Sequence, residues 1–196
     1  QIATDAIGSR IYVPDRGNKR IRFINVITNQ VTTLAGSGSV GTANGIGTAA
    51  SFTDPVAVTL GADDNLYILD QIASGVAKIR KLNLSTLEVT DFVDLGFTPT
   101  NYLVTDKGGD MYLTAGDTSG LRRITRDGLV LVLPNSEPLK SLAISPENGD
   151  VIIGPIMGAS MTASFTNKGY FFTPGESITI TPALFAGLSF DLTNGT

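Results

Sequence analysis

The stretch "IYVPDRGNKRIRFINVITNQVTTLAG", residues 11–36, decides the fold of this chain. It contains three runs rich in β-branched and aromatic residues, and polar turn residues separate these runs. Short runs of this kind, bounded by Gly, Asn and Asp, are typical of antiparallel strands. The stretch therefore predicts three neighbouring strands of one sheet.

The same pattern returns along the chain at a regular interval. A proline opens an apolar run every 39 to 44 residues, at Pro55, Pro99, Pro138 and Pro182. Each repeat then has a polar turn and a strand-like run whose second residue is aromatic or branched: Tyr12, Tyr67, Tyr112 and Ile152. Four short strands in each 40 to 45 residues are typical of a β-propeller blade. We therefore predict an all-β chain folded as a propeller of four-stranded blades.

The repeats resemble the NHL repeat, in which Tyr-Val-x-Asp, a short Gly/Asn turn and Arg-Ile-Arg follow one another. The first repeat matches this pattern at Asp15, Gly17, Asn18, Arg20, Ile21 and Arg22. The second keeps Asp70 and the Lys78, Ile79, Arg80 run, and the third keeps Arg123 and Ile124 but has Ala115 in place of the aspartate. The fourth has Gly154 at that position and no basic pair.

The period divides the chain into four blades and one surplus strand. We predict blades at approximately 1–36, 55–93, 99–133 and 138–175, and an extra inner strand at 182–191. The resemblance to NHL propellers implies a ring of about six blades. We therefore expect 1–196 to be an incomplete ring, completed by further blades or by a partner chain.

A glycine-rich loop at 34–52 contains Gly36, Gly38 and Gly41 in the G-x-G-x-x-G spacing of dinucleotide-binding proteins. In those proteins a helix starts at the third glycine. Here "TANGIGTAASFTDP" follows Gly41 and has no helical periodicity. Asp63, at the distance of a ribose-binding acid, falls in a predicted hairpin turn. We therefore interpret the loop as a connection between blades and predict no cofactor.

Composition excludes several kinds of chemistry. The 196 residues include no cysteine and no histidine, so disulfides, thiolate nucleophiles, Cys/His zinc sites and imidazole bases are ruled out. The formal net charge of -4 argues against general attraction to nucleic acid. No run approaches the roughly 18 apolar residues of a membrane span, so we expect no membrane insertion.

Basic residues concentrate in the first repeat. We interpret Asp15 with Arg20, and Asp70 with Lys78 or Arg80, as bonds that tie adjacent strands of one blade. The basic residues also form a candidate interaction surface, to which we add two methionines of the apolar fourth repeat. The predicted surface residues are Arg16, Lys19, Arg20, Arg22, Met157 and Met161.

No residue is predicted to be catalytic or to bind a metal. Acidic and amide residues in the turns lack the spacing of a calcium loop, and turn formation accounts for them. They are Asp63, Asp64, Asn65, Asp106, Asp110, Asp191 and Asn194. The only glutamates, Glu88, Glu137, Glu147 and Glu176, are not at predicted inner-strand positions.

Residues 151–190 contain few charged side chains, as expected of a segment covered by a protein partner or by further blades, including those of a homo-oligomer. We predict a non-catalytic binding or structural module that mediates protein–protein or glycan contacts in an extracellular, cell-surface, filament or virion assembly. The alternative is the remnant of a six-bladed hydrolase or lyase that binds its metal through oxygen ligands.

Overall fold

The computed structural model describes residues 1–72, 76–115 and 120–132 in full, and the backbone of four more strands. Within these residues the only helices are two three-residue 3-10 turns, η1 (Arg16–Asn18) and η2 (Gly47–Ala49). Everything else that is regular is β-strand. The predicted all-β class is therefore confirmed.

The first sheet comprises the stretch with which the sequence pattern begins. Its strands are β1 (Ala3–Thr4), β2 (Arg10–Asp15), β3 (Arg20–Asn25) and β4 (Gln30–Ala35). They pair in sequence order as antiparallel hairpins, because each connecting turn is only a few residues long. In the β3–β4 turn the Asn25 side chain accepts hydrogen bonds from the amides of Ile27 and Thr28, and Asn29 takes the left-handed conformation with φ 56°.

The second sheet has five strands. Four are consecutive: β6 (Pro55–Leu60), β7 (Asn65–Ile72), β8 (Val76–Asn83) and β9 (Glu88–Asp94). The fifth, β5 (Gly45–Ile46), lies in the glycine-rich loop and pairs with the outer edge of β9. The sequence predicted only a connection there. Two residues are too few to carry a strand pattern, and the pairing is made by a partner more than forty positions away.

The third sheet is again four antiparallel strands in sequence order. They are β10 (Pro99–Thr105), β11 (Met111–Ala115), β12 (Leu121–Ile124) and β13 (Val130–Val132). Two further pairs follow, β14 (Leu139–Ile144) with β15 (Val151–Pro155), and β16 (Met161–Ala163) with β17 (Ile178–Ile180). The predicted strand at 182–191 lies outside the described residues.

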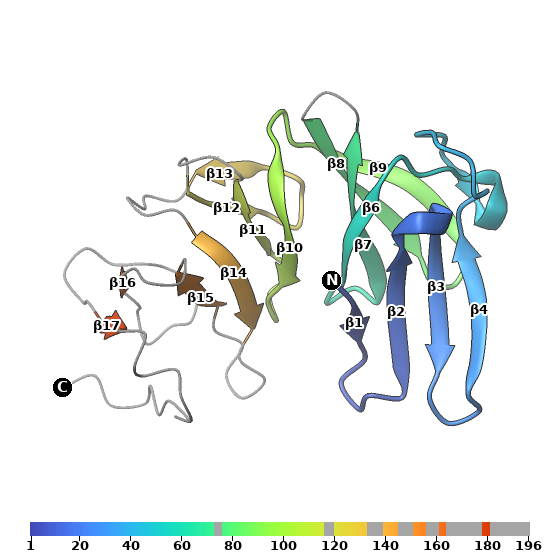
Figure 1. Ribbon diagram of the computed structural model, residues 1–196, viewed down its shortest axis with the longest axis horizontal. Coiled ribbons are helices and arrows are strands. Elements are labelled where there is room, and N and C mark those ends of the chain that lie inside the picture. Colours follow the sequence, from blue (N-terminus) through green and yellow to red (C-terminus); the bar gives the residue numbers. More distant parts are fainter. Residues whose placement is uncertain are drawn as a thin grey trace.

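The sheets stand side by side in sequence order, as Figure 1 shows, and pack face against face. Side chains alternate along β7, so Leu66 and Ile68 face the first sheet while Tyr67 and Leu69 face the third. Two cores result, one on each face of the second sheet. This radial stacking of four-stranded units is the predicted propeller arrangement. No helix in the described residues is long and apolar enough to cross a membrane.

Candidate functional site

Two residues of the predicted basic surface bind an aspartate at the start of the second sheet. Arg16 follows β2, and its Nε and Nη2 atoms lie 2.7 and 2.5 Å from the two carboxylate oxygens of Asp54. Lys19 Nζ is 3.6 Å from the same carboxylate. The hydrogen bond from the Arg16 guanidinium holds the pKa of Asp54 below its usual value. These charges therefore connect the first two sheets.

The other two arginines also make contacts within the fold. Arg20 donates from Nη2 to the Ser37 carbonyl at 3.0 Å. Arg22 donates from Nε to Asp15 at 2.9 Å and from Nη1 to the Thr33 hydroxyl at 2.5 Å. The prediction that Asp15 pairs with Arg20 is therefore wrong. Asp15 and Arg20 are opposite in register, but the long Arg22 side chain reaches the carboxylate along the same face of β3.

The predicted surface residues of the fourth repeat cannot be placed in a contact. Met157 lies outside the described residues, and Met161 is described only as the first backbone position of β16.

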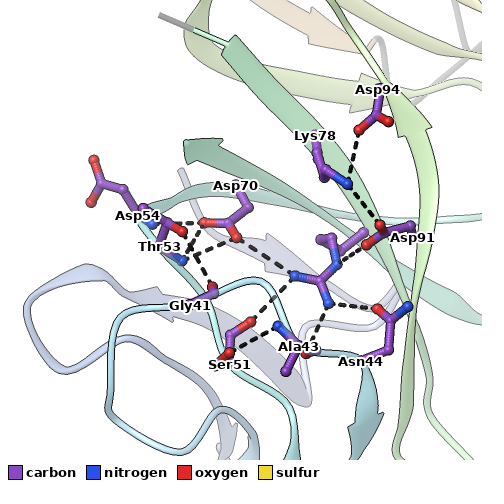
Figure 2. Close-up of polar contacts among 11 residues, drawn as sticks. Gly41, Ala43, Asn44, Ser51, Thr53, Asp54, Asp70, Lys78, Asp91 and Asp94 are labelled. Carbon is purple, nitrogen blue, oxygen red and sulfur yellow. Dashed lines mark hydrogen bonds and ion pairs between the residues drawn. The ribbon is translucent and has the colours of Figure 1, made fainter. Parts of the chain in front are cut away.

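Among the described residues, Arg80 on β8 is a fully buried charged side chain with several polar partners. Its guanidinium is 0% exposed and donates to the Ser51 carbonyl at 3.2 Å, the Ala43 carbonyl at 3.1 Å and the Asn44 side chain at 2.7 Å. All three acceptors belong to residues 36–54, which we call the connector because they lead from the first sheet to the second. Figure 2 shows these acceptors together with Asp70 and Asp91. We use the name Arg80 joint for Arg80 together with Ala43, Asn44, Ser51, Asp70 and Asp91.

Asp70, at the fifth position of "LYILD", fixes the end of the connector. Its carboxylate accepts the Asp54 amide at 2.7 Å and the Thr53 amide at 3.1 Å, and lies 3.7 Å from Nη1 of Arg80 (Figure 2). Burial raises the pKa of Asp70, while the amide donors and the Arg80 charge act in the opposite direction. A fully buried carboxylate with these partners holds main chain in place.

Asp91 on β9 completes the Arg80 joint from the outer side. Its Oδ1 lies 2.7 Å from Nε of Arg80 without the alignment of a hydrogen bond, so the contact is an ion pair. Lys78 lies 2.8 Å from Asp91 and 3.1 Å from Asp94. Of the two predicted partners of Asp70, the structure therefore selects Arg80, while Lys78 pairs with the outer strand.

The aspartates of the hairpin turns have partners of their own. Asp63 accepts from Lys81 at 2.9 Å and from the Tyr67 hydroxyl at 3.1 Å. Burial opposes its ionisation, but these donors and Asn65 outweigh that effect and lower the pKa of Asp63 to about 2. In the third sheet, Asp106 accepts from the Tyr112 hydroxyl at 3.1 Å, and Asp110 forms an ion pair with Arg123.

The connector uses its own amides rather than offering them to a phosphate. Gly36, Ser37 and Gly41 donate their N–H groups to the carbonyls of Gly47, Ala50 and Phe52 respectively. No helix other than the short η2 follows Gly41 in the described part of the chain. A dinucleotide site needs such amides free at the start of a helix. The geometry is that of a folded connection between two sheets.

In the described part of the chain, no three acidic side chains lie close enough together to bind one metal ion. Most carboxylates named above instead accept from a cation, an amide or a hydroxyl within the fold. Of the Arg80 joint, the sequence predicted only the pairing of Asp70 with Arg80, as one of two alternatives. Asn44 and Ser51 give no local signal, because only the three-dimensional course of the connector brings them to Arg80, whereas Asp91 lies opposite Arg80 in the β8–β9 pairing.

The chain is similar in structure to much longer proteins. It matches a gluconolactonase-like protein over 92% of its own residues and 63% of that chain, at 12% identity and a TM-score of 0.59. It matches TolB of Acinetobacter baumannii over 86% of its own residues and 40% of that chain, at 15% identity and a TM-score of 0.56. It matches an auxiliary nutrient binding protein of Bacteroides thetaiotaomicron over 85% of its own residues and 38% of that chain, at 11% identity and a TM-score of 0.60. At the sequence level, no family model and no curated protein matches.

The sheets and these likenesses together define the class. The chain is a β-propeller-type protein built of antiparallel four-stranded units, and it spans less than two thirds of each of these three structures.

Proposed function

We propose that the chain is a segment of an NHL-type propeller that acts as a non-catalytic module and mediates protein–protein or glycan contacts. One observation carries this proposal: several carboxylates of the described residues hold strands, turns and the connector together. Asp70 holds the end of the connector through main-chain amides, Asp54 joins it to Arg16 after β2, and Asp110 ties the β10–β11 turn to β12 through Arg123.

A metal-dependent hydrolase needs a different arrangement. Its carboxylates must converge on one point with oxygens free to bind the ion and the substrate. Removing a carboxylate from such a centre often stabilises a protein, because the centre is strained for function. Removing one from a structural joint leaves donors unpaired and destabilises the protein. The two functions therefore predict opposite changes in the free energy of unfolding when a carboxylate is removed.

The test substitutes Asp70, Asp91 and Asp110 one at a time by asparagine and measures the free energy of unfolding in urea. We expect each variant to lose about 1 kcal/mol or more. Asp127→Asn is the matched control, since Asp127 is exposed in the β12–β13 turn. Variants that are more stable than the wild-type chain would contradict the proposal.

The same samples test the alternative, a remnant hydrolase, which the likeness to a gluconolactonase-like protein favours. Hydrolysis of glucono-δ-lactone is followed with and without Ca²⁺, Mg²⁺, Mn²⁺ and Zn²⁺. In every case we expect the lactone to be hydrolysed no faster than in the buffer alone. Metal-dependent hydrolysis that Asp91→Asn or Asp110→Asn abolishes would establish the alternative.

We also propose an extracellular or cell-surface location. The support is compositional: the chain is rich in Gly and low in charge. Fractionation of the producing cell tests this, and recovery only from the cytosolic fraction would contradict it.

A further inference from the structure

Each sheet turns the same face toward the sheet that precedes it. In the second sheet this face carries Leu66, Ile68, Leu82 and Val89, which pack against the first sheet and the connector and are all 0% exposed. In the third sheet the equivalent residues are Met111, Leu113 and Ile124, which pack against the second sheet and are also 0% exposed. The equivalence follows from the alignment of Tyr12, Tyr67 and Tyr112.

The first sheet has the same face, but no described sheet covers it. Across its strands Ile11 pairs with Ile24 and Ile24 with Val31, just as Leu66 pairs with Leu82 and Leu82 with Val89 in the second sheet. None of these three first-sheet residues is buried, and Val31 is 62% exposed. We call this surface the leading face, which consists of Ile2, Ile11, Val13, Ile24 and Val31.

The leading face also carries a polar pair, Arg22 and Asp15. The equivalent pair of the second sheet binds the connector. Val13 lies opposite Arg22 as Ile68 lies opposite Arg80, so Arg22 occupies the position of Arg80. Asp15 likewise occupies the position of Asp70. Arg80 donates to three connector groups and Asp70 accepts two connector amides, whereas Arg22 and Asp15 contact each other and their own sheet.

We propose that the leading face is the docking surface for a further four-stranded blade of the same ring, and that Arg22 and Asp15 bind the main chain of the connector leading from that blade. The apolar row accepts a sheet, and the charged pair accepts the carbonyl and amide groups of an irregular segment. The solved propeller-like structures are long enough to hold such a blade, because this chain spans 63% of one and 40% of another.

This docking surface does not depend on whether the chain is catalytic, since a blade docks in the same way in an enzyme and in a binding module. The lactone and metal assays above decide the function without testing this surface. The experiment below tests the surface without an activity assay.

The test adds a blade to the chain and measures whether it covers the leading face. In the tandem chain, residues 1–54 are repeated ahead of Gln1, so that a copy of the first sheet and its connector precedes the original. Because the sequence has no cysteine, Ile24→Cys in the original first sheet gives a single reactive site. We expect a water-soluble maleimide to modify this cysteine about tenfold more slowly, or slower still, in the tandem chain than in the 196-residue chain.

Two variants make the result specific. Val132→Cys on β13, where Val132 is 67% exposed, serves as the control and should react equally in both chains. Arg22→Gln in the original sheet of the tandem chain should restore most of the reactivity of Cys at position 24. Equal reactivity at position 24 in the two chains would overturn the proposal. Slow modification of the 196-residue chain that quickens on dilution would also overturn it, because a second copy would then cover the face.

Discussion

At the scale of single residues, the buried pair of Arg80 and Asp70 explains how the connector is held. A buried ion pair gains little over apolar packing, because both charges lose their hydration. Its cost is offset here by hydrogen bonds to main-chain groups that would otherwise be unsatisfied. The pair therefore specifies where the connector lies. Loss of Arg80 leaves the buried carboxylate of Asp70 with fewer partners.

Replacing Arg80 by leucine should reduce the free energy of unfolding by about 3 kcal/mol or more, the usual cost of breaking a buried pair from one side. Urea denaturation measures it. Arg126→Leu is the matched control, because Arg126 is exposed and its hydrogen bond to Asp110 is made by its backbone amide. Equal losses of unfolding free energy in the two variants would show that the Arg80 joint does not stabilise the fold.

Asp63 gives the chain a pH dependence in the acid range. Its pKa is about 2 in the folded chain and about 4 in an unfolded one, so the unfolded chain binds more protons between these values. Stability from this group is therefore complete above pH 4 and is lost as the pH falls through 2. The contribution is below about 1 kcal/mol, because the ion pair with Lys81 is partly exposed and screened.

The measurement compares the wild-type chain with Asp63→Asn in urea at pH values from 2 to 6. We expect the wild-type chain to be more stable at pH 6 and the difference to shrink toward pH 2. A difference that stays constant across this range would contradict the assigned pKa.

At the scale of elements, the connector depends on glycine at one position. Gly36 has φ +103°, and a Cβ there would overlap the Lys19 carbonyl oxygen and lie 2.9 Å from Cα of Arg20. Gly36→Ala should therefore cost about 2 kcal/mol or more in unfolding free energy, since both conformation and space oppose it. Gly17→Ala is the control, because nothing lies within 4 Å of its Cβ position. A Gly36→Ala chain as stable as Gly17→Ala would mean that the connector is not held at β3.

Local pattern was enough to predict the hairpins. The repeat of Tyr12, Tyr67 and Tyr112 gave the period, and the runs around them became β2, β7 and β11. A strand pattern and its turn residues lie within a dozen positions of one another, so single-sequence reasoning can detect them. The identification of the glycine-rich loop as a connection rests on the same local evidence.

Long-range contacts were beyond that reasoning. β5 forms because the connector runs along β9, and Asn44 meets Arg80 for the same reason, across 36 positions of sequence. The pairing of Asp15 with Arg22 instead of Arg20 depends on side-chain reach, which the alternation of residues does not encode. The contacts of Arg80 with the connector are of this long-range kind, so the site was the part that the sequence predicted least.

At the scale of the whole molecule, the second sheet is the centre of the described part. Both cores include its residues, with Leu66 and Ile68 in one and Tyr67 and Leu69 in the other. The first sheet is joined to it through the connector and the Arg80 joint, whereas the third sheet packs on its opposite face. Weakening the joint should therefore release the first sheet before the third.

Amide hydrogen exchange of the wild-type chain and Arg80→Leu tests this account most directly. If the buried charges serve to join sheets, the variant loses protection in the connector, at Gly41 and Ser51, and in the first sheet, at Ile21. The third sheet, at Leu113, keeps its protection. Equal loss of protection in the first and third sheets, or none in the connector, would contradict the account.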